Sequence, residues 1–212
     1  ALRFVLTSIV KDIPSEPKPN NRIGFSIFEK KIYAIRNNAK KQAAAYLKTR
    51  GIDAGTLPED AFYQSNSQDG LASSIVFVDS EKRLINTRKL TLEKGQYFND
   101  GTLYNSVYDA MYKPSDEWVF LVEGCINSLS LQGYSSLAFF SADNNFNDYP
   151  KLEKYVREKR VVLAFDNDAA GDMLTTRMLS LIVDNELGNI VVSQLLLPPK
   201  VDLNDLLREG QL

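Results

Sequence analysis

The stretch VVLAFDNDAAG, residues 161–171, does most to decide the fold. It begins as an apolar run typical of a buried strand and ends in two acids, Asp166 and Asp168, before small residues and Gly171. Carboxylates two positions apart at the end of a strand point the same way, which suits a divalent cation bound jointly with phosphate oxygens. The pattern therefore predicts a strand that delivers a pair of candidate metal ligands.

Two further segments place acids where strands are expected to end. WVFLVEG (118–124) is apolar until Glu123, and LLLPPKVDLNDLL (195–207) carries Asp202 after two prolines. Glu123 would then share one sheet edge with the acid pair. Asp202 could complete a metal site or cap a terminal helix, and both interpretations stay open.

Apolar runs alternate with helical patterns throughout the C-terminal half. They predict strands at 118–122, 136–140, 161–165 and 190–197, with helices near 126–133, 150–159 and 170–186. This alternation favours an α/β fold, in which a parallel sheet is flanked by helices. Ligands bind such sheets beyond the carboxyl ends of the strands, where these acids fall.

The N-terminal half is less regular. SSIVFVDSEKRLINTRKL (73–90) predicts a hairpin with its turn near Asp79 to Lys82, and KDIPSEPKPNN (11–21) is a Pro-rich connector. We expect two parts, a smaller α+β subdomain over residues 1–116 and the α/β part over 117–212.

Composition excludes several classes of protein. The chain has 212 residues, a single cysteine, Cys125, and no histidine, so it has neither a disulfide framework nor a Cys/His zinc site, and metal chemistry must rely on oxygen ligands. No apolar run approaches the roughly 20 residues that span a bilayer. We expect a cytoplasmic protein without a membrane partner.

The net charge of −2 hides an uneven distribution. Residues 1–50 hold eleven Lys and Arg against three Asp and Glu, whereas the rest of the chain is acidic. Arg36, Lys40, Lys41, Lys48 and Arg50 surround a helical run whose Ala43, Ala44 and Leu47 could form its buried side. This surface is either a solvated helix face or a contact for a phosphate backbone, whose affinity would fall steeply with salt.

Other motifs that begin with D-x-D fit less well. An EF-hand loop starting at Asp166 would need an oxygen ligand at its fifth position and Glu at its twelfth, but Ala170 and Arg177 stand there. Haloacid-dehalogenase phosphotransferases want Thr or Val at position 170, so they are a weak competitor. Asp168 could also simply cap the following helix.

Taken together, the Glu-Gly strand end, the D-x-D-x-x-G strand end and the K-x-D-x-N-D-L-L tail resemble the Toprim domain of DnaG-type primases, topoisomerases and some nucleases. Three upstream segments are similar to those of bacterial DnaG-type primases: AYLKTRGI (45–52), the hairpin at 73–90 and QYFNDGTLYN (96–105). The resemblance implies a Rossmann-like Toprim sheet preceded by a basic primase-like subdomain.

The same resemblance implies a DNA primase catalytic core, a nucleotidyltransferase that makes short RNA primers on single-stranded DNA during chromosomal or mobile-element replication. Its cofactor would be Mg²⁺ or Mn²⁺, and its partners would be the template, ribonucleoside triphosphates and a replicative helicase. Glu123, Asp166 and Asp168 would be catalytic and, with Asp202, would bind metal. The expected contacts to nucleic acid or nucleotide are Arg50, Arg88, Lys89, Lys94, Lys40 and Lys41.

The chain departs from the family pattern in three places. Asn127 stands where an Asp is usual, which would weaken metal binding, and Gln96 stands where a Lys is usual. This sequence contains no zinc ribbon of the kind that precedes primase cores, so either it is a piece of a longer chain or the protein lacks that module, and we expect priming by this chain alone to be feeble. A Toprim-type nuclease and a non-catalytic nucleic-acid-binding module remain alternatives, whereas a topoisomerase would need a further domain with a nucleophilic Tyr.

Overall fold

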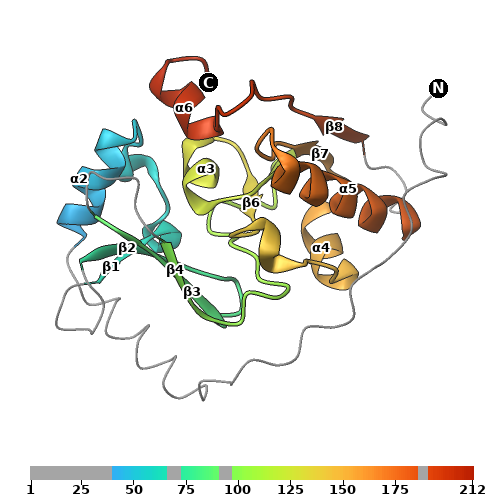
Figure 1. Cartoon of the computed structure of the whole chain (residues 1–212), viewed down its shortest axis with the longest axis horizontal. Helices are drawn as coiled ribbons and strands as arrows, with labels where there is room; N and C mark the ends of the chain where they lie inside the picture. The colour runs from blue at the N-terminus through green and yellow to red at the C-terminus, as the bar shows by residue number, and fades with distance from the viewer. Residues whose placement is uncertain (1–39, 66–72, 91–96, 186–190) are drawn as a thin grey trace.

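Two four-stranded sheets, one antiparallel and one parallel, organise the computed structural model of the chain (Figure 1). The structure describes residues 40–65, 73–90, 97–185 and 191–212. The antiparallel sheet has the order β1-β2-β3-β4 and holds β1 (Tyr63–Ser65), β2 (Ser74–Val78), β3 (Leu84–Lys89) and β4 (Tyr97–Gly101). The parallel sheet has the order β6-β5-β7-β8 and holds β5 (Trp118–Val122), β6 (Ser136–Ala138), β7 (Arg160–Leu163) and β8 (Val191–Gln194).

Local turn chemistry explains the hairpin of β2 and β3. The Asp79 backbone N–H donates to the Leu84 carbonyl at 3.1 Å, and the Asp79 carboxylate accepts the Leu84 N–H at 2.9 Å. Lys82 takes the left-handed conformation that closes the turn, with φ of 58°. The hairpin predicted around residues 79–82 is therefore confirmed.

Helices flank both sheets. The N-terminal part contributes α2 (Lys41–Thr49) and two 3₁₀ turns, η1 (Ala54–Thr56) and η2 (Glu59–Ala61). The C-terminal part contributes α3 (Cys125–Ser130), η4 (Ala142–Asn144), α4 (Tyr149–Val156), α5 (Ala169–Asp184) and α6 (Leu203–Arg208). The predicted strand and helix alternation, and with it the α/β class, is confirmed.

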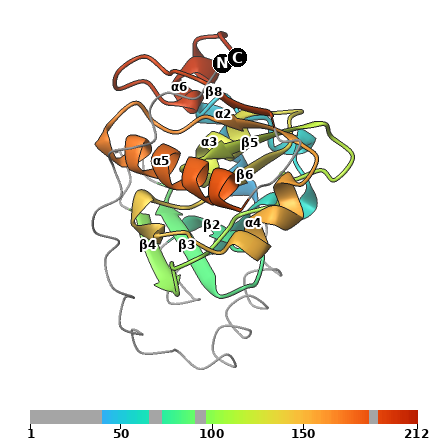
Figure 2. The same cartoon turned by 90° about the vertical axis from the view of Figure 1, so that its right-hand side faces the viewer.

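Side-chain alternation along the strands of the parallel sheet supplies two apolar faces. Leu121 and Leu163 pack with α4 and α5, whereas Val122 and Ala164 pack with α3 on the other face. Figure 2 shows α4 and α5 together in front of the strands, with α2 behind them. This arrangement follows from right-handed crossovers, because the connections after β6 and β7 run in the opposite direction to the one after β5.

One apolar core joins the two sheets. It includes Leu47 of α2, Phe77 of β2, Ile126 of α3 and Leu203 of α6, all buried. Tyr108, in the connection between the sheets, forms a bridge with Ala138 at the edge of β6 and donates its hydroxyl to the Ala61 carbonyl. The division at residues 116 and 117 stays a prediction, and the shared core fixes both sheets around the space between them.

Several sequence predictions concern residues that the structure does not describe. Lys94, Gln96 and the part of the predicted basic excess that falls in residues 1–39, including Arg36, lie outside the described residues. Of the predicted buried side of α2, Ala43 and Leu47 are fully buried and Ala44 is partly buried. None of the helices in the described ranges has the length and apolar character needed to cross a membrane.

Candidate active site

The strand order of the parallel sheet creates a crevice between β5 and β7. The chain leaves β5 toward β6 on one side and leaves β7 toward β8 on the other, so the strand order reverses between these two neighbours. Open α/β sheets bind ligands at such switch points, beyond the carboxyl ends of the strands. Glu123 directly follows β5 and Asp166 follows β7, so the topology itself brings these two acids together.

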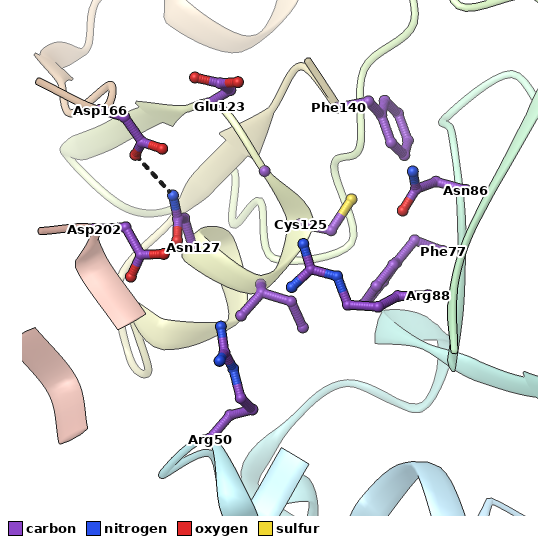
Figure 3. Close-up of a pocket in the computed structure, with 12 residues that line it drawn as sticks. Arg50, Phe77, Asn86, Arg88, Glu123, Cys125, Asn127, Phe140, Asp166 and Asp202 are labelled. Carbon is purple, nitrogen blue, oxygen red and sulfur yellow. Dashed lines mark hydrogen bonds between the residues drawn. The ribbon is translucent and has the colours of Figure 1, made fainter. Parts of the chain in front are cut away.

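Glu123, Asp166 and Asp202 line one side of a cleft at this position, and we refer to them as the acidic wall (Figure 3). Asp202 reaches it from the N-terminus of α6, which packs against α3. Three elements distant in sequence thus contribute one acid each. The prediction that Glu123 and Asp166 would meet at one sheet edge agrees with this arrangement.

The carboxylate of Glu123 is partly buried and lies near other acids. Burial, then repulsion from Asp166, Asp168 and Asp143, raises its pKa to about 7, although a backbone N–H from Ala142 partly offsets the rise. Its Oε2 atom is buried and, within the described part of the chain, accepts no hydrogen bond. The protonated form of Glu123 is therefore favoured at pH values where an ordinary Glu is ionised, and one of its oxygens lacks a partner.

Asp166 is also partly buried near other acids, and its pKa is raised as well. Burial, followed by the charges of Asp202, Asp168 and Asp205, raises its pKa to about 6. Asn127 on α3 donates its Nδ2 to Asp166 Oδ1 at 3.2 Å, which favours the ionised form. Asn127, noted in the sequence only as a departure from the family pattern, thus replaces a fourth negative charge with a hydrogen-bond donor.

Gly171 allows the chain to turn tightly behind Asp166. A Cβ atom at Gly171 would stand 1.8 Å from the Asp166 carbonyl oxygen, so only glycine fits between the strand end and α5. The glycine of the D-x-D-x-x-G segment therefore sets the position of an acid five residues earlier.

Asp168 and Asp202 both act as helix caps. Asp168 Oδ1 accepts the backbone N–H groups of Ala170 and Gly171, each at 2.9 Å, and its side chain stays exposed at the start of α5. Asp202 forms a capping box with Asp205 at the start of α6. The capping interpretation is thus realised for both, and only Asp202 also lines the cleft.

Arg50 and Arg88 line the same cleft from the N-terminal part, and we refer to them as the basic wall (Figure 3). Arg50 ends α2, and its carbonyl accepts the Nδ2 group of Asn204 on α6 at 2.8 Å. Asn204, fully buried, also donates to Ser130 Oγ at 2.9 Å, so it links the end of α2 to α3 and α6. Arg88 lies on β3, half exposed.

The other predicted basic contacts that the structure describes, Lys40, Lys41 and Lys89, do not line the cleft. Lys40 approaches the rings of Phe62 and Tyr63, at 5.0 and 5.1 Å from their centroids, and donates to the Glu59 carbonyl. Partial burial lowers its pKa. Lys41 and Lys89 are exposed, and Lys89 alternates with Arg88 along β3, so it points to the opposite face of the sheet.

The acidic wall has the composition expected for Mg²⁺ or Mn²⁺, because all its donors are carboxylate oxygens. Across the residues that the structure describes, however, no three acidic or sulfur ligands lie close enough together to hold an ion as they stand. Two observations favour a cation here: the unpartnered buried Oε2 of Glu123 and the mutual repulsion that raises both carboxyl pKa values. The residues therefore fit a divalent metal.

The cleft also has a lining that sequence patterns did not single out. Phe77 and Asn86 of the antiparallel sheet and Phe140 after β6 complete it. Asn86 looks like an ordinary hairpin residue and Phe140 like an ordinary strand residue, and only the docking of the two sheets reveals them. The left-handed φ of Phe140, 66°, leaves no signal in a sequence.

Comparisons with known proteins agree with this geometry. Residues 120–207 match the family described as Toprim-like. The primase fragment of the bacteriophage T7 primase-helicase protein is 16% identical, with a TM-score of 0.59 over 77% of this chain and 68% of that one. The E. coli primase catalytic core is 15% identical, with a TM-score of 0.59 over 87% of this chain and 74% of that one.

No curated protein matches the sequence. The predicted resemblance is nevertheless confirmed at the level of fold, because both the domain match and the two solved structures point to the same architecture. The C-terminal part of this chain is thus similar to the Toprim-like family, and the chain as a whole shares the fold of these two primase structures.

Proposed function

We propose that this chain is the catalytic core of a DNA primase, which joins ribonucleotides into short primers on single-stranded DNA. The observation that carries the proposal is the meeting of an acidic wall and a basic wall in one cleft. A triphosphate has several negative charges and cannot approach Glu123, Asp166 and Asp202 without cations, whereas Arg50 and Arg88 offer it fixed donors.

Glu123, Asp166 and Asp202 are the residues that would hold Mg²⁺ or Mn²⁺, with Asp168 close enough to add its charge to the site. When bound, the metal would neutralise the triphosphate, lower the pKa of the attacking 3′-hydroxyl and stabilise the pyrophosphate leaving group. Arg50 and Arg88 would orient the phosphates from the opposite side. This division of roles explains why the chain needs no histidine.

Glu123 is also suited to accept a proton from the attacking hydroxyl. A general base works best when its pKa lies near the working pH, and in the absence of metal the pKa of Glu123 is raised to about 7. A cation bound to Glu123 itself would lower this pKa, so the role of base belongs to Glu123 when Asp166 and Asp202 hold the metal. Its buried, unpartnered Oε2 is the atom that would take the proton. Asp166, held by Asn127, stays ionised more readily and is better placed as a ligand.

The template and the partners complete the proposal. Single-stranded DNA would pass along the basic wall, and ribonucleoside triphosphates would enter the cleft. A replicative helicase is among the expected partners, because one of the similar structures comes from a primase-helicase protein. Lys89 lies outside the cleft and would add only a weak contact with template, and Lys94, outside the described residues, stays a predicted contact.

The test incubates the chain with single-stranded DNA, labelled ribonucleotides and Mg²⁺ or Mn²⁺, and separates the products by size. We expect short oligoribonucleotides, reduced about 10²–10³-fold by Asp166→Asn or Glu123→Gln. Asp172→Asn is the matched control, because it removes an exposed charge from the first turn of α5 outside the cleft. Shortened DNA in place of new RNA would instead assign a nuclease.

A non-catalytic nucleic-acid-binding module is the second candidate. It is favoured by the absence, among the described residues, of three ligands already grouped for an ion, and by Asn127 in contact with Asp166. This candidate predicts DNA binding that neither Mg²⁺ nor Asp166→Asn changes, together with no product of either kind.

A further inference from the structure

Arg50 stands at a helix end whose last carbonyl is left to bind outside the helix. In the turn that ends α2, the Gly51 N–H donates to the Lys48 carbonyl at 3.1 Å, and the Ile52 N–H donates to the Leu47 carbonyl at 2.9 Å. This is the Schellman motif, which requires the left-handed φ of 74° that Gly51 adopts. The motif uses the carbonyls of the preceding turn, so the Arg50 carbonyl is available to another element.

Asn204, the second residue of α6, binds this carbonyl although it lies 154 positions away in the sequence. Its Nδ2 donates to the Arg50 carbonyl at 2.8 Å and to Ser130 Oγ at 2.9 Å, and its side chain is fully buried. A carbonyl only accepts, so the amide must present its NH₂ group to Arg50. The Ser130 hydroxyl is oriented as well, because it donates to the Ile126 carbonyl at 2.8 Å. The carboxamide is therefore held in one orientation where α2, α3 and α6 meet.

Each of the three helices that meet at Asn204 carries a group that lines the cleft. Helix α2 ends at Arg50, and α6 is capped by Asp202, two residues before Asn204. Helix α3 contains Asn127, which is hydrogen-bonded to Asp166. One buried amide thus connects an arginine of the basic wall to the elements that hold the acidic wall.

The turn after Arg50 also packs directly against α6. A Cβ atom at Gly51 would lie 3.5 Å from Arg208 Cγ and 3.7 Å from Leu207 Cγ, so the backbone of the turn is in van der Waals range of the end of α6. Leu203, at the start of α6, is fully buried in the apolar core that joins the two sheets. Helix α6 therefore packs against both parts of the chain, and Asn204 is a polar contact within that packing.

The position of the Arg50 side chain depends on where α2 ends. Arg50 is half-buried and lines the cleft, and in Figure 3 its side chain extends from the end of α2 into this space. Its Nε atom is buried and has no hydrogen-bond partner among the residues that the structure describes. Hydrogen bonds to Nε therefore do not hold the guanidinium, and its place follows from the backbone that Asn204 binds.

Folding stability alone does not account for an amide at position 204. The Oδ1 atom of Asn204 is buried and, within the described ranges, has no hydrogen-bond partner. Burying an unsatisfied acceptor costs free energy that an apolar side chain of the same size would avoid. Buried polar groups of this kind can fix how elements pack even where they add no stability.

We propose that Asn204 is a positioning residue, which holds Arg50 at a fixed distance from the acidic wall. A triphosphate bound with cations at the acidic wall would then meet Arg50 without any movement of α2. The inference rests on the proposed function, because that function assigns the triphosphate to Arg50. It adds a residue that touches no substrate and acts through the Arg50 carbonyl.

The test is a double-mutant cycle on the affinity for ATP with Mg²⁺, measured by calorimetry. Asn204→Leu keeps the approximate size of the side chain but cannot donate to the Arg50 carbonyl, so it should weaken ATP binding about tenfold. In an Arg50→Ala background the same change should weaken binding less than about twofold, because the residue through which Asn204 acts is gone. In an Arg88→Ala background the loss of about tenfold should remain.

Ser130→Ala is the matched control. It removes the other hydrogen-bond partner of Asn204 and leaves the Arg50 carbonyl in place, so it should lower the free energy of unfolding in urea but keep ATP affinity within about twofold. Asn204→Ser is the second variant if Asn204→Leu does not fold. Its shorter side chain no longer reaches the Arg50 carbonyl and adds no apolar group, and it should give the same pattern in the cycle.

Three results would overturn the inference and leave the proposed function standing. They are an equal loss of affinity in all backgrounds, a loss from Ser130→Ala as large as that from the Asn204 variant, and unchanged affinity in the Asn204 variant. The first two would mean that Asn204 only maintains the fold. If Arg50→Ala alone leaves ATP affinity unchanged, or if the unmodified chain does not bind ATP with Mg²⁺, the role that the proposed function gives to the basic wall fails, and the inference fails with it.

Discussion

The acidic wall and the basic wall face each other across one cleft, yet they are placed by different kinds of structure. Glu123 and Asp166 each follow a strand of one parallel sheet, so backbone hydrogen bonds between β5 and β7 determine their separation. Arg50 comes from the end of a helix and Arg88 from near the end of a hairpin strand, and their position depends on how the N-terminal part packs against α3 and α6. One wall is a product of topology and the other of docking.

The two walls also differ in how they affect folding stability. Burial and neighbouring acids raise the pKa values of Glu123 and Asp166. The acidic wall is therefore destabilised as it stands and gains from a cation. Variants of the acidic wall should change folding stability and catalysis strongly, whereas variants of the basic wall should change affinity moderately.

Gly171→Ala should have the largest effect on folding stability, because it disturbs the backbone that positions Asp166 in the acidic wall. The added Cβ would stand 1.8 Å from the Asp166 carbonyl oxygen, and neither backbone segment can move without disturbing the strand end. We expect a loss of about 3 kcal/mol or more in the free energy of unfolding, measured by urea denaturation.

Gly124→Ala is the control at the other strand end of the same wall. A Cβ there has no atom within 4 Å, and the residue has an ordinary φ of −112°. The Gly124→Ala variant should lose less than about 1 kcal/mol in the free energy of unfolding. Equal losses at the two glycines would show that the acidic wall does not depend on the close approach behind Asp166.

Asp166→Asn should stabilise the metal-free chain at alkaline pH. A carboxyl with a raised pKa binds its proton more tightly in the folded chain, so stability falls as the pH rises from the ordinary value of 3.8 through about 6 and stays lowered above it. The Asp166→Asn variant should gain about 1–2 kcal/mol in the free energy of unfolding at pH 8, after allowance for solvent screening, and almost nothing at pH 4.

The measurement is denaturation at pH 4 and pH 8 in a chelator, then at pH 8 with Mg²⁺. The cation should stabilise the original chain and leave the variant nearly unchanged, which would reverse their order. A variant that is less stable than the original at pH 8 without metal would contradict the repulsion that we describe.

Arg88→Ala should reduce affinity for single-stranded DNA about three- to tenfold and make the dependence on salt less steep. Lys89→Ala removes the same charge from the next residue of β3, on the face away from the cleft, and should change affinity less than twofold. Fluorescence titration at several salt concentrations distinguishes them. If the two variants behave alike, the basic wall has no special role beyond its charge.

These contrasts show what the sequence could predict. Glu123 and Asp166 could be predicted from the sequence, because an apolar run followed by an acid indicates both a strand and the residue at which it ends. The carboxyl ends of parallel strands lie at one edge of the sheet, so the two acids were expected to lie close together. Arg50 and Arg88 were predicted together with Lys40, Lys41 and Lys89, because charge composition cannot tell which cations face a cleft. Only the docked structure separates them.

The remaining features of the cleft depend on properties with no sequence pattern. Asn86 becomes part of the site through its cross-strand pairing and burial, and Phe140 through a left-handed turn held by Tyr108. Asn127 was noted as a missing charge, yet its contact with Asp166 depends on the position of α3 beside the segment that follows β7. Long-range packing decides such roles, and local propensity does not contain it.

Replacement of Lys41 and Lys48 by alanine should have the smallest effect and would define how far the basic wall extends. Both lysines are exposed on α2, whereas Lys40 is engaged by the Glu59 carbonyl and two aromatic rings and contributes to packing. If template follows the helix, the double variant should lower affinity about twofold at low salt and flatten the salt dependence less than Arg88→Ala does. Unchanged salt dependence would show that α2 presents a solvated face. The basic wall would then consist of two arginines positioned by docking, and the charge-rich sequence around them would serve solubility instead of recognition.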